Sequence, residues 1–93
     1  MDKLELFNGI ISVITPVNSM GANAESLDQA LTDTGLDSLD LIMMGIYLSD
    51  IYGVSEEVAK QMQPTTVGDM FVFMEAHATN QPTSVKLSLD SIK

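Results

Sequence analysis

A serine between two aspartates, in the stretch Asp37-Ser38-Leu39-Asp40, is the residue whose type and setting most clearly predict chemistry. Asp37 is a favourable N-cap, and Asp40 lies three residues later, where an acid completes a capping box. Ser38 is then the first residue of a helix, beside unpaired backbone N–H groups and the positive end of the helix dipole. Both would stabilise a phosphate ester on its hydroxyl. The residues alone therefore predict a site for a phosphate-linked modification.

Other residue types that carry chemistry are few. The chain has no cysteine and one histidine, His77, so disulfides and thiolate metal sites are excluded. We expect a surface or capping role for His77, near a helix end. Asp33, Asp37 and Asp40 lack the alternating oxygen ligands and the distal glutamate of a calcium loop. No nucleophile, metal-ligand set or phosphate-cradling glycine loop can be assembled, so we expect neither catalysis nor a metal site.

The composition is that of one small acidic domain. The 93 residues include 13 acidic and four basic ones, with a net charge of −9, which repels nucleic acid and anionic membranes and favours partners with basic patches. No apolar run reaches the ~20 residues that span a bilayer, and the N-terminus lacks the pattern of an export signal. We expect a soluble, cytoplasmic monomer.

Apolar periodicity predicts an all-α fold, a small four-helix bundle with a long loop after the first helix and a short third helix. The predicted helices cover residues 2–17, 38–52, 55–62 and 66–78. Gly53 is the expected stop of the second helix, and Thr65 or Thr66 the cap of the fourth. We expect a domain over residues 1–78 and a C-terminal tail over 79–93, flexible or loosely docked, with a short strand near Val85 as the alternative.

The second helix is apolar around much of its circumference. Its expected core face consists of Leu41, Met44, Gly45, Leu48, Ile51 and Tyr52. Asp37, Asp40 and Asp50 mark the solvent side, whereas Leu39, Ile42, Met43 and Ile46 widen the apolar surface. Either this helix is the most buried one, or part of that surface docks partners. On the fourth helix Phe71 and Phe73 cannot both face the core, and we expect Phe73 to be partly exposed.

The helices, the acidic charge and the stretch Gly35-Leu36-Asp37-Ser38-Leu39-Asp40, backed by Thr65-Thr66-Val67-Gly68-Asp69, resemble the acyl carrier protein family over about residues 2–78. The resemblance implies a 4′-phosphopantetheine arm on Ser38, transferred from coenzyme A by a phosphopantetheinyl transferase, the holo-acyl-carrier-protein synthase. Acyl groups would ride on its thiol as thioesters. The protein would then be a carrier and not an enzyme, and would serve fatty acid, lipid or polyketide biosynthesis.

The resemblance also implies how partners would read the chain. Asp37 would help the transferase hold its metal and coenzyme A, and Leu39 and Asp40 would belong to the surface that it reads. Acyl-transferring or synthase enzymes would dock through basic or apolar patches, against a surface that includes Met43, Ile46 and Asp50. Positions 41–49 carry no charge, whereas carriers of fatty acid synthesis usually have glutamates there. This departure predicts specialised partners with apolar docking surfaces.

An acyl chain would need a slot between the helices, and methionine and glycine suit such a lining because methionine repacks readily and glycine leaves room. The candidate lining residues are Met44, Gly45, Leu48, Met62, Met70 and Met74. Two alternatives stay open. One is a peptidyl or aryl carrier of a nonribosomal peptide pathway, and the other is an unmodified acidic adaptor that binds a partner through its apolar second helix.

Overall fold

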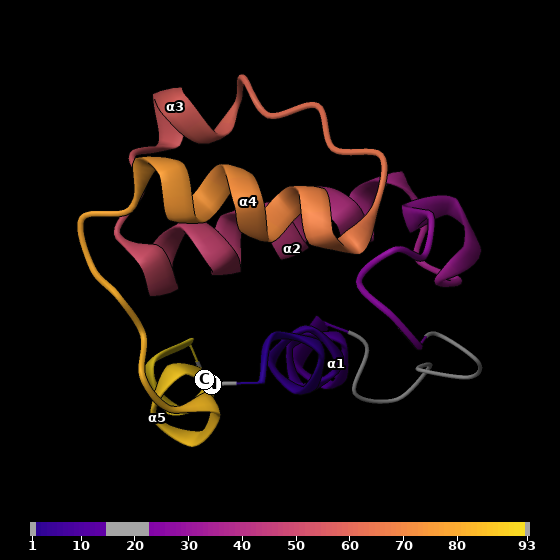
Figure 1. Cartoon of the computed structure of the whole chain (residues 1–93), viewed down its shortest axis with the longest axis horizontal. Coiled ribbons are helices and arrows are strands. Elements are labelled where there is room, and N and C mark those ends of the chain that lie inside the picture. The colour runs from indigo at the N-terminus through magenta and orange to yellow at the C-terminus, as the bar shows by residue number, and fades with distance from the viewer. Residues whose placement is uncertain (1, 15–22, 93) are drawn as a thin grey trace.

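The computed structural model of the protein describes residues 2–14 and 23–92, and the regular elements in these ranges are helices. They are α1 (Lys3–Ile14), the 3-10 turn η1 (Leu31–Asp33), α2 (Ser38–Tyr52), α3 (Glu56–Ala59), α4 (Val67–His77) and α5 (Val85–Ile92). Figure 1 shows α2 and α4 packed over α1, with α3 at the rim and α5 beside α1. The prediction of a small all-helical bundle is confirmed. No helix in the described ranges is long and apolar enough to cross a membrane.

Capping residues set the ends of α2 and α4 where the sequence predicts them. Gly53 ends α2 with a φ of 68°, in the left-handed region that favours glycine. Thr66 caps α4, and its hydroxyl accepts a hydrogen bond from the Asp69 N–H at 3.2 Å. Asp69 in turn accepts from the N–H groups of Thr65 and Thr66, both at 3.0 Å. These backbone hydrogen bonds lower the pKa of the Asp69 carboxyl, because they stabilise its charged form.

The first helix begins where expected, and the third is shorter than expected. The side chain of Asp2 accepts from the Glu5 N–H at 3.1 Å, so α1 begins where predicted. Its expected end near Pro16 and the loop that follows fall partly on residues 15–22, which lie outside the described residues. Ser55 caps α3 as predicted, but this helix is a single turn that ends at Ala59, short of Met62.

Three aromatic rings from three helices meet at the centre of the core. The ring centroid of Phe71 on α4 lies 6.4 Å from that of Phe7 on α1 and 6.4 Å from that of Tyr52 on α2. All three side chains are buried. Such tilted and edge-on pairs are favourable geometries for aromatic rings. Phe73 is only half-buried, as predicted.

The expected flexible tail is instead helix α5, and this prediction is corrected. Val85, Leu89 and Ile92 recur at helical spacing and pack against the core, so the segment has an apolar stripe to bury. Leu89 lies directly on Gly9 of α1, where an added Cβ would come within 2.6 Å of its Cδ1 atom. Within the described residues 2–14 and 23–92, α5 therefore packs with the other helices as one unit, which has five α-helices instead of the four expected.

The segment before α5 is also held in place. The N–H groups of Thr79 and Asn80 both donate to the Tyr52 carbonyl at 3.0 Å. The Asn80 amide donates to the Ile51 carbonyl at 2.8 Å. These bonds satisfy carbonyl groups that the C-terminal turn of α2 leaves without intrahelical partners. The alternative of a strand near Val85 is excluded, because this residue begins α5.

The Tyr52 hydroxyl is buried and has no hydrogen-bond partner in the part of the chain that is described. Burial, with a smaller contribution from the charge of Glu75, raises its pKa from 10.0 to about 12. Folding therefore favours the neutral phenol, and this stabilisation is lost as the pH rises from 10 through about 12. Because an unpartnered buried hydroxyl is costly, Tyr52→Phe should raise the free energy of unfolding by about 1 kcal/mol.

Thermal unfolding between neutral and alkaline pH tests this prediction, with Tyr47→Phe on the half-buried Tyr47 of the same helix as the control. We expect Tyr52→Phe to raise the melting temperature by about 4–8 °C and to weaken the alkaline loss of stability. A lower melting temperature for Tyr52→Phe would show that the hydroxyl is stabilising and contradict the prediction.

Candidate modification site and adjoining cleft

Ser38 lies where the sequence predicts it, as the exposed first residue of α2. The Asp37 carboxylate accepts from the Asp40 N–H at 2.8 Å, and the Asp40 carboxylate accepts from the Asp37 N–H at 3.4 Å. This reciprocal capping box fixes the helix start and turns both carboxylates to the backbone. The Ser38 hydroxyl is therefore accessible at the positive end of the α2 dipole.

The turn that leads into Ser38 is fixed from within. Thr34 is fully buried, and its hydroxyl donates to the Leu31 carbonyl at 2.6 Å and accepts from the Leu36 N–H at 3.4 Å. Gly35 has a φ of 86°, which a residue with a Cβ rarely adopts. The side chain of Leu36 is buried in the core. The site is thus an exposed serine on a rigid, anchored turn.

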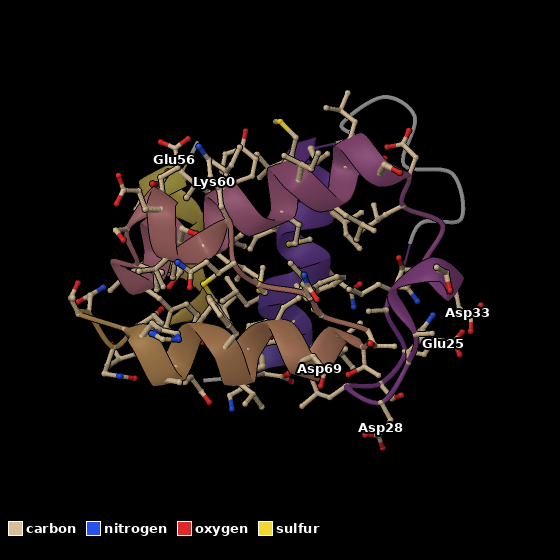
Figure 2. All side chains as sticks on the ribbon, turned by 90° about the horizontal axis from the view of Figure 1, so that it is seen from above. Glu25, Asp28, Asp33, Glu56, Lys60 and Asp69 are labelled. Carbon is tan, nitrogen blue, oxygen red and sulfur yellow. The ribbon has the colours of Figure 1, made fainter. Side chains whose placement is uncertain are left out.

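The loop before this turn is attached to the start of α4. Ala30 and Thr66 form an isolated antiparallel bridge, and the Val67 N–H donates to the Gln29 carbonyl at 3.0 Å. The Gly68 N–H donates to the Leu27 carbonyl at 2.7 Å. A Cβ on Gly68 would lie 3.0 Å from that carbonyl oxygen, so glycine permits the close approach. In Figure 2 Asp69 lies at the same end of the molecule as Glu25, Asp28 and Asp33 of the loop.

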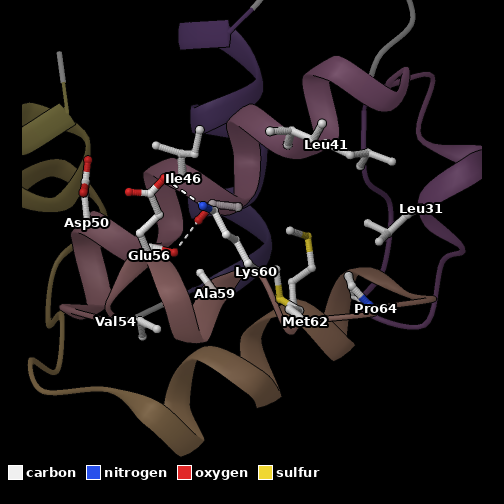
Figure 3. A pocket seen from close by; sticks show the side chains of 14 residues that line it. Leu31, Leu41, Ile46, Asp50, Val54, Glu56, Ala59, Lys60, Met62 and Pro64 are labelled. Carbon is white, nitrogen blue, oxygen red and sulfur yellow. Dashed lines mark hydrogen bonds and ion pairs between the residues drawn. The ribbon is translucent and has the colours of Figure 1, made fainter.

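A cleft of about 680 Å³ runs along α2 and opens to solvent. Its other walls are formed by α3, by the segment after α3 and by the first turn of α4. Figure 3 shows the side chains that line it. On α2 the lining residues are Leu41, Ile42, Gly45, Ile46, Ser49 and Asp50. Leu41 and Ile42 are three and four residues after Ser38, so the cleft begins about one turn from the serine. Its volume suits a small-molecule ligand.

Half of the predicted acyl-pocket residues line this cleft. Gly45, Met62 and Met70 do so, and the Met62 methyl lies 3.6 Å from the position of a Cβ on Gly45. Met44, Leu48 and Met74 are instead fully buried in the core, away from the cleft lining. These three residues are therefore not part of the cleft lining, and their role in an acyl pocket stays a prediction.

Several further residues line the cleft without having been predicted to do so, among them Leu31, Leu41, Ile42, Ser49, Ala59 and Pro64. The cleft residues on α2 could have been predicted from their helical spacing. Residues three, four, seven, eight and eleven positions after Ser38 fall on one face of a helix, and these are Leu41, Ile42, Gly45, Ile46 and Ser49. The residues from η1 and from the segment after α3 could not be found in this way, since only the tertiary fold brings them to α2.

A row of exposed apolar side chains follows Ser38 along α2. Leu39, Ile42 and Ile46 are 66%, 61% and 51% exposed, which is unusual for large apolar residues. Met43 is half-buried and Asp50 is exposed. Of the predicted partner-reading residues, Leu39, Met43, Ile46 and Asp50 thus lie on or beside this exposed surface of α2, whereas Asp37 and Asp40 belong to the capping box at its start. Ile42 was missed as an exposed member of the row.

The remaining candidates form no reactive cluster. His77 is exposed, with its ring centroid 4.6 Å from that of Phe73, which agrees with a surface role. Within the described ranges no three histidine, aspartate or glutamate side chains converge as a metal site would require. Comparisons with protein-family models, with curated proteins and with solved structures found no match to the chain. Any function must therefore be argued from the site itself.

Proposed function

We propose that the protein is an acyl carrier that holds acyl groups as thioesters on a 4′-phosphopantetheine arm at Ser38. The observation that carries the proposal is one exposed serine at a capped helix start, about one turn from an apolar cleft. The helix dipole and free N–H groups favour the phosphodiester. The cleft offers a place for the acyl chain, as the resemblance to the acyl carrier protein family leads us to expect.

The modification needs no catalytic group from this chain. The Ser38 oxygen would attack the coenzyme A phosphorus next to pantetheine, and its bond to the bridging oxygen of the pyrophosphate would break. Adenosine 3′,5′-bisphosphate leaves, and the serine proton passes to a base of the phosphopantetheinyl transferase. An arm on a rigid turn then confines its thioester near the helix face that partners contact, which raises the effective concentration of the cargo at their active sites.

The mass of the intact protein after incubation with coenzyme A and a broad-specificity transferase tests this proposal. We expect complete addition of one phosphopantetheine to the wild-type chain and none to Ser38→Ala. Ser26→Ala, at an exposed loop serine, is the matched control and should be modified like the wild type. Absence of the arm from the wild type, or its persistence in Ser38→Ala, would contradict the proposal.

A second function from another class has its own supporting observation. The exposed row Leu39, Ile42 and Ile46 suits an unmodified adaptor that binds an apolar partner surface. For an adaptor, Ser38→Ala would keep full function in the host whereas Ile46→Glu would abolish it. For a carrier, Ser38→Ala abolishes function by itself.

A further inference from the structure

The two ends of the cleft differ in polarity. Figure 3 shows Leu31, Leu41, Met62 and Pro64 at one end, whereas the charged residues Asp50, Glu56 and Lys60 lie toward the other, together with Ile46, Val54 and Ala59. The apolar end is the one nearer to Ser38 along α2. From Leu41 to Ser49 the cleft follows α2 for roughly 12 Å, at 1.5 Å per residue. A ligand that fills its length therefore meets only apolar side chains at one end, and both apolar and polar side chains at the other.

Ser49 places a hydroxyl inside the cleft. The residue is only 6% exposed and lines the cleft on the same face of α2 as Gly45. Its hydroxyl donates to the Gly45 carbonyl at 2.7 Å, and the Met74 sulfur, at 4.0 Å, is a weaker competing acceptor. A serine hydroxyl has one hydrogen and two lone pairs. Since the hydrogen is already committed, Ser49 can offer a ligand only an acceptor.

The charged groups at this end lie at the rim. The Lys60 Nζ atom lies 3.7 Å from the Glu56 Oε1 atom, and the two side chains are 72% and 82% exposed. Asp50 is also exposed. Exposed ion pairs of this kind contribute little to binding. Selection inside the cleft therefore depends on the buried hydroxyl of Ser49, which favours a donor such as a ligand hydroxyl over an acceptor such as a ketone.

We infer that the cleft selects hydroxylated acyl chains, and that Ser49 is the residue that accepts a hydrogen bond from the cargo hydroxyl. The inference rests on the proposed carrier function and specifies its substrate class. A saturated chain leaves the Ser49 lone pairs without a donor, and a keto chain brings an oxygen without a hydrogen to share. The hydroxyl of a hydroxyacyl chain can donate a hydrogen bond to the Ser49 oxygen, so that neither group is left without a partner.

The test measures how fast hydroxylamine cleaves the thioester, because a docked chain withdraws the thioester from attack. The protein is loaded with decanoyl, β-hydroxydecanoyl, ω-hydroxydecanoyl and β-ketodecanoyl pantetheine. For at least one hydroxylated chain we expect cleavage about two- to tenfold slower than for decanoyl or the keto chain. Ser49→Ala should remove this advantage. Ser12→Ala is the matched control, since Ser12 makes the same type of bond, to the Asn8 carbonyl at 3.4 Å, but is exposed on α1.

The outcomes separate this inference from the function on which it rests. If no arm is attached at Ser38, the carrier function fails. If the arm is attached but all four chains are cleaved at the same rate, or Ser49→Ala leaves the hydroxyl preference intact, the inference is overturned and the carrier function stands. If Ser49→Ala alters the melting temperature of the arm-bearing protein without cargo as much as that of the hydroxyacyl form, the hydroxyl serves the fold or the arm, and the inference is likewise overturned.

Discussion

Replacing Phe71 by alanine should lower the free energy of unfolding by about 3–5 kcal/mol, the cost of deleting a large aromatic side chain from a packed core. The residue is 1% exposed, and its ring is the one that contacts both Phe7 and Tyr52. Its loss would remove the aromatic contacts of α4 with α1 and α2. We expect the melting temperature to fall by more than 10 °C, as measured by thermal unfolding.

The neighbouring residue supplies the control for this prediction. Val72 follows Phe71 on α4 but is 67% exposed, so Val72→Ala should change the free energy of unfolding by no more than about 0.5 kcal/mol. Similar melting temperatures for Phe71→Ala and Val72→Ala would mean that the aromatic cluster does not hold the helices together.

Replacing Gly45 by leucine should fill the cleft and expose the acyl thioester. The position has room for a Cβ, whose closest neighbour would be the Met62 methyl at 3.6 Å, and the rest of a leucine side chain would occupy the space beyond it. Each CH₂ group that is displaced loses about 0.8 kcal/mol of burial. Displacement of two or three such groups should speed hydroxylamine cleavage of decanoyl thioester by roughly ten- to a hundredfold.

Faster cleavage in Gly45→Leu would not result from unfolding. Leucine is a better helix former than glycine by about 1 kcal/mol, so the melting temperature of Gly45→Leu should not fall. Ala76→Leu adds the same side chain to an exposed site on α4, so it should leave both cleavage and arm attachment as in the wild type. Unchanged cleavage in Gly45→Leu would show that the acyl chain does not occupy the cleft.

Local capping signals made the ends of α2 predictable to the residue. Asp37 and Asp40 form the capping box at its start, and Gly53 adopts the left-handed conformation at its end. The start of α4 was predicted to within one residue, as Thr65 or Thr66, and the cap is Thr66. In each case the signal lies within a few residues of the structure that it specifies, so no tertiary contact is needed to interpret it.

The fifth helix was missed because its sequence is ambiguous. The stretch Val85-Lys86-Leu87-Ser88-Leu89 alternates as a strand would, yet Val85 and Leu89 also lie on one helical face. What decides between the two is the surface of α1, where Gly9 leaves a hollow that receives Leu89. A contact between positions 80 residues apart cannot be predicted from local pattern.

The division of the methionines between core and cleft has the same cause. Met44 and Met74 are fully buried and lie outside the cleft lining, whereas the buried Met70 and the half-buried Met62 line the cleft. Local sequence does not separate them, because the cleft is formed by the position of α3 and of the segment after it, in which Met62 lies. Ser38, by contrast, was correctly placed at the helix start from Asp37 and Asp40, because the capping box alone defines that start.

The central claim is that Ser38 carries a phosphopantetheine arm, and the mass of the intact protein isolated from its own host tests it most directly. We expect the mass of the chain plus one phosphopantetheine, partly with a further acyl group, and fragmentation that places the phosphodiester on Ser38. A fully active protein with the mass of the unmodified chain, or with the arm on another residue, would contradict the account.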